Sequence, residues 1–134
     1  MDKIIDSCGN NAGKIWRVLN SEGPLSLDLL IEKTGLTEED IHSAIGWLSR
    51  EDKVYQLETT FGLGNTNLTS KIGKDAGKVW RVLDTWGEVD LLSISRLARI
   101  DKSEVLSAIG WLAKENKVKG NGFQNNKKIK FWLK

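Results

Sequence analysis

The hexapeptide Ser-Ala-Ile-Gly-Trp-Leu occurs twice in this chain, as Ser43–Leu48 and as Ser107–Leu112. The two copies are 64 residues apart, and the same offset aligns Ala12–Leu19 with Ala76–Leu83 without a gap. Of the 43 columns that this alignment covers, 18 hold identical residues. A repeat of this length indicates a duplicated supersecondary unit, and a unit of this size can fold around a modest core of its own.

We therefore predict two tandem domains, residues 1–64 (the first unit) and residues 65–134 (the second unit). In the first unit, apolar residues at helical spacing predict helices up to residue 19, over residues 27–33 and from residue 37 towards residue 52. Ser26 and Thr37 are suited to cap the second and third helices, and Gly35 to end the second. In the second unit Asp90 and Asp101 stand at the corresponding helix starts.

Alternating residues after the third helix predict a strand in each unit, and Leu25 a very short one before the second helix. Helix, turn, helix, turn, helix and strand is the order of a winged helix. The predicted fold class is α+β, mainly α: two tandem winged helix-turn-helix domains, each with three helices and a β-hairpin wing. We expect a shortened first wing, because residues 60–67 must also link the units.

Composition excludes several classes of protein. No apolar run is long enough to span a membrane and the N-terminus lacks a signal-peptide pattern, so we expect a cytoplasmic protein. With Cys8 as the only cysteine and His42 as the only histidine, neither a disulfide nor a zinc cluster is expected. Cys8 fits a small buried apolar position and His42 a helix boundary. No pair of catalytic residues or phosphate loop stands out, so we predict a protein without enzymatic activity, metal or cofactor.

Charge differs sharply between the two units. Residues 1–64 hold six lysines and arginines against eleven acidic residues, a net charge of −5, whereas residues 65–134 hold fourteen against seven, a net charge of +7. Cations that neutralise phosphates provide most of the affinity for nucleic acid. In the first unit Glu38, Glu39 and Asp40 open the helix that would read the major groove, where they would repel phosphates. We therefore expect the second unit to bind nucleic acid.

The candidate contacts lie on the second unit's helices and wing. They are Arg96, Arg99, Lys102, Ser103, Ser107, Lys114, Lys117, Lys119, Lys127, Lys128 and Lys130. None of the candidates on the third helix is an arginine or asparagine, the side chains that make two hydrogen bonds to one base in strong base readout. We therefore expect phosphate contacts with weak sequence specificity. The alternative is that the lysines only keep an amphipathic hairpin soluble.

Small and aromatic residues suggest where the units meet. Gly9 and Gly13, repeated as Gly73 and Gly77, are four residues apart on the first helix of each unit. We hypothesise that the two first helices cross at these glycines about a pseudo-twofold axis; packing within each unit is the alternative. Trp86 and Trp132, present only in the second unit, are candidates for the seam between the units. Trp47 and Trp111 either close the core or anchor a partner.

The pattern Ala-Gly-Lys-[Ile/Val]-Trp, followed later by Ala-Ile-Gly-Trp-Leu-x-[Arg/Lys]-Glu-x-Lys-Val, resembles a family of small prokaryotic winged-helix domains of unassigned function. The resemblance covers most of each unit and implies a DNA-binding type of fold with, by analogy, a transcriptional role. Members of that family usually have one domain per chain, so the tandem is expected to replace a homodimer, as a monomer with a pseudo-dimeric arrangement.

Two functional hypotheses remain at the level of sequence. In the first, the chain is a transcriptional regulator or a DNA accessory factor that binds double-stranded DNA through the second unit, while the first unit contacts a protein partner. In the second, it is a protein-interaction module that does not touch nucleic acid.

Overall fold

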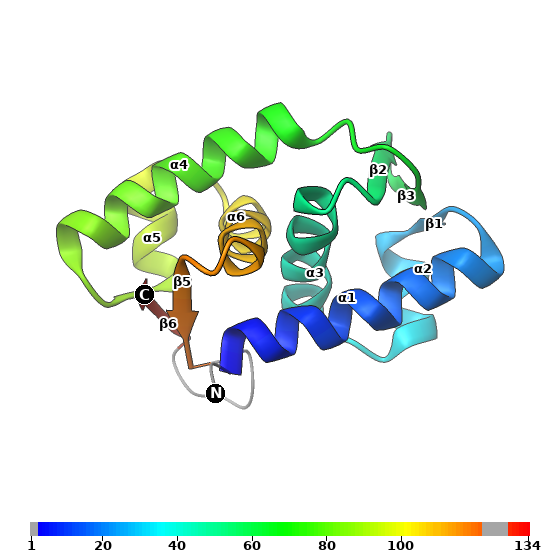
Figure 1. The fold of residues 1–134 in the computed structure, drawn as a ribbon, viewed down its shortest axis with the longest axis horizontal. Coiled ribbons are helices and arrows are strands. Elements are labelled where there is room, and N and C mark those ends of the chain that lie inside the picture. Colours follow the sequence, from blue (N-terminus) through cyan, green and yellow to red (C-terminus); the bar gives the residue numbers. More distant parts are fainter. Residues whose placement is uncertain (1–2, 122–128) are drawn as a thin grey trace.

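The computed structural model describes residues 3–121 and 129–134, and in this part of the chain each unit has three helices and a three-stranded antiparallel sheet (Figure 1). The first unit consists of α1 (Lys3–Glu22), β1 (Leu25–Ser26), α2 (Leu27–Thr34), α3 (Glu38–Arg50), β2 (Val54–Leu57) and β3 (Thr60–Leu63). The second unit consists of α4 (Thr69–Trp86), β4 (Val89–Asp90), α5 (Leu91–Ala98), α6 (Lys102–Lys114), β5 (Val118–Gly120) and β6 (Lys130–Leu133). The predicted fold class, two tandem winged helix-turn-helix domains, is confirmed.

Side-chain caps fix the starts of the second and third helices of both units. Ser26, Thr37, Asp90 and Asp101 each accept a hydrogen bond from a backbone N–H in the first turn of the helix that follows. Loss of such a cap typically costs about 1 kcal/mol. Gly35 ends α2 at a φ of 72°, in the left-handed region that favours glycine. All five positions were predicted from the sequence and are confirmed.

The two sheets have equivalent topologies, β1-β3-β2 and β4-β6-β5. In each, the two-residue strand just before the second helix pairs with the last strand of the wing, which places Leu25 opposite Phe61 and Val89 opposite Phe131. All four side chains are buried. The wing is thereby tied to the helices through the core.

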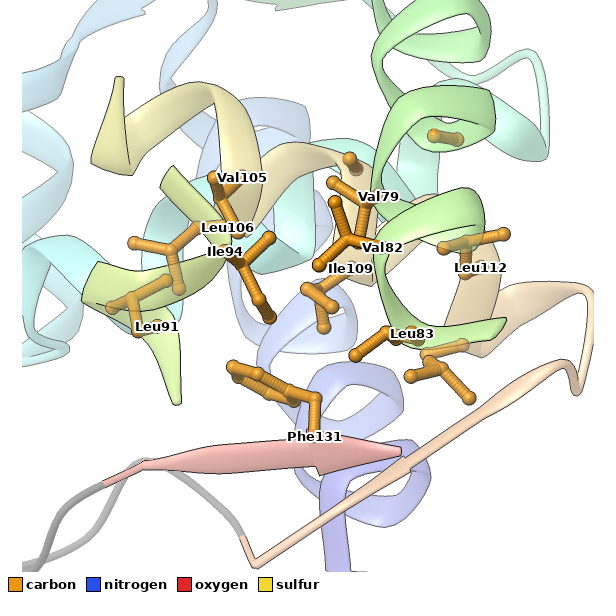
Figure 2. Close-up of a cluster of buried hydrophobic side chains, with 14 of the residues drawn as sticks. Val79, Val82, Leu83, Leu91, Ile94, Val105, Leu106, Ile109, Leu112 and Phe131 are labelled. Atoms are coloured by element: carbon orange, nitrogen blue, oxygen red, sulfur yellow. The ribbon is translucent and has the colours of Figure 1, made fainter. Parts of the chain in front are cut away.

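The hydrophobic cores do not follow the division into units. Figure 2 shows the larger cluster, in which Phe131 projects from β6 toward Ile94 on α5. Ile4 and Cys8, from the first two turns of α1, are fully buried in this cluster although they belong to the first unit. Conversely, Leu68, just before α4, packs against the first unit's core. The start of each long helix therefore packs on the other unit.

Helices α3 and α6 form the centre of the molecule, and α1 and α4 lie on opposite sides of this pair (Figure 1). The two helices cross at Gly46 and Gly110. A Cβ atom on Gly46 would overlap the backbone carbonyl of Ser107, and a Cβ on Gly110 would overlap that of Ser43. Only glycine at both positions allows the two backbones to approach this closely.

Candidate nucleic-acid interface

The α3–α6 crossing covers the surface through which a winged helix would normally read DNA. No residue from Ile41 to Ser49 on α3, or from Ser103 to Ala113 on α6, is exposed. A recognition helix must present one face to the major groove. Here each such helix faces the other, so neither can enter a groove while the two units stay packed.

Four of the candidate contacts with nucleic acid belong to α6, and this packing places them against α3 and not on an outer side of the helix that is free for DNA. The Ser107 hydroxyl donates to the backbone carbonyl of His42 at 3.3 Å, and Ser103 is half-buried beside it. Lys102 and Lys114 extend across to α3, where they pair with Glu39 at 3.2 Å and Glu51 at 3.4 Å. The prediction of a DNA-facing side was wrong because α3 and α6 pack on each other in a twofold-like way. The side of α6 that would face solvent in an isolated unit therefore faces α3.

Reciprocal contacts show that the two units are related by a pseudo-twofold axis. Arg50 pairs with Glu115 at 3.2 Å, and the equivalent residues of the other copy, Lys114 and Glu51, pair at 3.4 Å. Arg50 also lies over the Trp111 ring, 5.5 Å from its centroid, while Lys114 lies 5.1 Å from that of Trp47. Paired cation–indole contacts of this kind contribute roughly 0.5–1 kcal/mol each at exposed sites.

The glycine hypothesis placed the axis at the wrong helices. Gly9 and Gly73 lie under the rings of Trp47 and Trp111 of their own units, where an added Cβ would be 3.3 Å and 3.5 Å from the ring. Helices α1 and α4 do not cross (Figure 1). Gly13 and Gly77 face open space instead: a Cβ there would meet only the tip of Arg17 in the first case and nothing in the second. The glycines that allow a close helix crossing are instead Gly46 on α3 and Gly110 on α6.

The tryptophans are divided between packing and exposure. Trp47 and Trp111 are half-buried and pack against the core, as the core-closing interpretation expected. Trp86 is 63% exposed at the end of α4, so it does not line the seam between units. Trp132 does border the seam, in a groove that α1 forms with the second wing.

That groove, which we call the wing groove, has a volume of about 730 Å³. It lies between the first turns of α1 and the strands β5 and β6, and its lining residues are Lys3, Ile5, Asp6, Asn116, Lys119, Gly120, Asn121, Trp132 and Lys134. Among the residues that the structure describes, three lysines thus face one aspartate, next to an indole and two amides. Sequence reasoning found Lys119 and Trp132 but missed Lys3 and Lys134, because they come from opposite ends of the chain.

The corresponding position in the first unit is filled by the link between the units. Asn67 makes two hydrogen bonds to the backbone of Gln56, at 3.0 Å and 2.7 Å, and the Thr66 N–H donates to Asp52 at 2.8 Å. In the repeat, Asp52 corresponds to Asn116 and Asn67 to Lys3. In the wing groove, Lys3 stands at the position where Asn67 makes these hydrogen bonds in the first unit.

The remaining candidate cations are spread over the second unit. Arg96 and Arg99 are exposed at the end of α5, and Arg99 adopts a left-handed φ of 58°. Lys117 pairs with Glu115 at 3.7 Å, and Lys130 pairs with Glu88 at 3.7 Å. Lys127 and Lys128 lie outside the described residues. Of the predicted residues that the structure describes, Lys119 alone lines the wing groove.

His42 is half-buried where the starts of α3 and α6 meet, near Glu38, Glu39 and Asp101. Burial lowers the pKa of this imidazole below 6.5, and the nearby carboxylates offset the effect only in part. As pH falls through about 6.5 the unfolded chain binds more protons than the folded one, so the free energy of unfolding should fall. We expect this decrease between about pH 7 and pH 5.5 in urea titrations.

The chain itself supplies the control, because the second unit has Leu106 at the position equivalent to His42. His42→Leu should remove the decrease above about pH 5.5. The pKa values of the Glu39 and Asp101 carboxyls are also lowered, but these two groups affect the free energy of unfolding only at more acidic pH. Equal pH dependence in the two proteins over this window would contradict the assignment.

Within the described ranges, no cluster of three metal-ligating side chains is present, and no helix there is long and apolar enough to cross a membrane.

The sequence profile of a family described as a winged helix-turn-helix domain (DUF2582) matches residues 1–61 and, a second time, residues 67–132. An uncharacterized protein of Methanocaldococcus jannaschii, MJ1608, is 37% identical over 60 residues, which cover 43% of this chain and 86% of that protein. That relative is therefore similar to about one unit of the chain. No solved structure matches the sequence significantly.

Proposed function

The chain belongs to the winged helix-turn-helix family DUF2582, and we propose that it is a non-enzymatic regulator or accessory factor that associates with nucleic acid through the wing groove of its second unit. The observation that carries the proposal is the lining of this groove, where Lys3, Lys119 and Lys134 outnumber Asp6 beside Trp132. Lysines placed in this way neutralise phosphates, and an adjacent indole and amides contact sugars or bases.

The proposed mode of binding differs from that of an ordinary winged helix. Because α3 and α6 cover each other, the contacts are made by the wing and by the start of α1. Such contacts position a phosphate backbone but read little sequence. Apart from the start of α1, the first unit, with a net charge of −5, adds no cation to this groove and is available for contacts with a protein partner.

The double variant Lys119→Glu/Lys134→Glu should weaken binding of a labelled 20-base-pair duplex in fluorescence anisotropy. Removing one phosphate-binding cation reduces the slope of log affinity against log salt by about 0.9, so we expect the slope to fall by roughly 2 and the affinity at low salt to fall more than tenfold. Titrations at a low and a moderate salt concentration measure both quantities.

A variant with the same net charge separates the groove from the overall charge. Lys33→Glu/Lys74→Glu changes two exposed lysines that do not line the wing groove. It should keep most of the affinity. Equal losses in the two double variants would rule out the groove as the binding site.

One observation favours the alternative, a protein-interaction module: the closure of both recognition helices leaves no surface for ordinary DNA reading. Absence of binding to duplex and single-stranded DNA at low salt would favour this alternative over our proposal.

A further inference from the structure

Two further grooves, which we call the twin grooves, lie on the first helix of each unit where it meets the end of the third. The first has a volume of about 510 Å³ and is lined by Gly9, Ala12, Gly13, Trp16, Arg17, Trp47, Leu48, Glu51 and Lys53. The second has a volume of about 420 Å³ and is lined by Gly73, Ala76, Gly77, Trp80, Arg81, Trp111, Leu112, Glu115 and Lys117. Both volumes are typical of small-ligand sites.

The two linings are identical at all nine equivalent positions. This is far above the level of the repeat, in which 18 of 43 columns are identical. The other long identical stretch, Ser43–Gly46 with Ser107–Gly110, is accounted for by the α3–α6 crossing. The copies have therefore kept the same residues where the units pack and where these grooves lie.

Packing inside the protein explains only part of the lining. Gly9 and Gly73 are needed beneath the tryptophan rings. Packing does not require glycine at positions 13 and 77. Neither Gly13 nor Gly77 has a left-handed φ, and an added Cβ would meet no backbone and no core side chain. Glycine inside a helix is less stable than alanine, so a glycine that packing does not require calls for another explanation. Trp16 and Trp80, one turn further along, are each 39% exposed. The glycines leave open a notch beside exposed indoles.

Charge in the grooves is positive in both units. Glu51 is neutralised by Lys53 at 3.5 Å and by Lys114 at 3.4 Å, and Arg17 is exposed at the same groove. The second groove has the same arrangement. There Glu115 pairs with Arg50 at 3.2 Å and with Lys117 at 3.7 Å, beside the exposed Arg81. The lining of each groove thus has two cations and one carboxylate, and a third cation from the other unit pairs with that carboxylate, even in the unit whose net charge is −5. This balance favours an anionic occupant.

We propose that each twin groove binds one unstacked nucleotide of single-stranded nucleic acid. Its base lies over the glycine floor against the indoles, and its phosphate pairs with Arg17 or Arg81. Flat aromatic walls next to phosphate-binding cations are the two features that single-strand binding sites combine. Arginine is suited to the phosphate because its planar guanidinium can donate two parallel hydrogen bonds.

The arrangement of the two grooves sets the expected number of strands bound per chain. Arg50, next in sequence to Glu51 of the first groove, contacts Trp111 and Glu115 of the second groove, so the ends of α3 and α6 that contribute to the two grooves meet at the pseudo-twofold axis. The pseudo-twofold axis gives the grooves opposite directions, whereas a strand has one direction. We therefore expect two short oligonucleotides per chain, one in each groove.

Isothermal titration of the full chain with the tetranucleotide (dT)4 tests the proposal. The expected stoichiometry is two per chain, and Trp16→Leu and Trp80→Leu should each reduce it to one, because loss of a stacking partner lowers affinity at that groove about tenfold or more. Gly77→Ala, which adds one methyl group to the floor of the second groove, should also leave one tight site. It has no packing atom to disturb, so it tests the groove without harming the fold.

Several outcomes would overturn the proposal. Thymidine monophosphate binding as tightly as (dT)4 would indicate a free nucleotide, and an acidic phenylalanine-containing peptide binding more tightly, with weaker binding in the same variants, would indicate a protein partner. No binding, or two sites that persist in Trp16→Leu and Trp80→Leu, would exclude the grooves. The inference extends the proposed association with nucleic acid but does not depend on the wing groove. Lys119→Glu/Lys134→Glu should leave the stoichiometry at two, so either proposal can fail alone.

Discussion

Replacing Gly46 with alanine is expected to lower the free energy of unfolding by about 3 kcal/mol. The new methyl group would occupy the position of the Ser107 carbonyl oxygen, which belongs to the backbone of α6 and cannot rotate away. The two helices would have to separate along their whole crossing, which opens the contacts of Arg50 with Trp111 and of Lys114 with Trp47. Urea unfolding followed by tryptophan fluorescence measures the decrease.

The matched control is the same substitution at Gly77, also within a helix. Apart from its chain neighbours and its own helix backbone, no atom lies within 4 Å of a Cβ there, so alanine should raise the free energy of unfolding by about 1 kcal/mol through helix propensity. The two glycine-to-alanine changes should thus have opposite signs. If Gly46→Ala left the free energy of unfolding unchanged, α3 and α6 could not approach each other as closely as described. The conclusion that the two recognition helices cover each other would then also fail.

The local structure of this chain could be predicted from the sequence because short-range chemistry determines it. Asp90 and Asp101 cap helices through bonds to their own first turns, and Gly35 ends α2 through its own backbone conformation. The 64-residue repeat then doubled every such prediction. The resemblance to small winged-helix domains was confirmed for the same reason, since its motif describes one unit.

The arrangement of the units could not be predicted in the same way. Six glycines stand in helices of the repeat, and the sequence does not say which pair brings two helices together. Gly9 and Gly13 were given this role because of their spacing, whereas the crossing uses Gly46 and Gly110. One signal was available: Ser43, Ala44 and Gly46, three small residues on one predicted helix, are identical in both copies.

The candidate site was predicted in part for a similar reason. Charge counting identified the second unit and its Lys119, because net charge is a property of composition. Lys3 and Lys134 were missed, since they reach the wing groove only when α1 of the first unit lies along β5 and β6. Lys102 and Lys114 were given to a DNA surface because an isolated helix has an outer face; in the folded chain that face is the seam.

Replacing Ile4 with alanine should lower the free energy of unfolding by about 2–5 kcal/mol, the range for a buried isoleucine or leucine in a core. A residue this close to an N-terminus would ordinarily have almost no effect, because the first turn of a helix frays. Ile4, however, is fully buried in the core of the second unit, among residues more than 70 positions away. Urea unfolding gives the size of the decrease, and native-state hydrogen exchange shows which amides become less protected.

Ile15→Ala provides the comparison, because Ile15 lies on the same helix and is equally buried, but in the first unit's core. Exchange at amides of α5 and β6 should accelerate more in Ile4→Ala, and exchange at amides of α2 and β3 more in Ile15→Ala. A decrease below about 1 kcal/mol for Ile4→Ala would mean that the start of α1 only rests on the second unit. In that case Lys3 would not be held beside Lys119, and the wing groove would lack the wall that makes it a phosphate site.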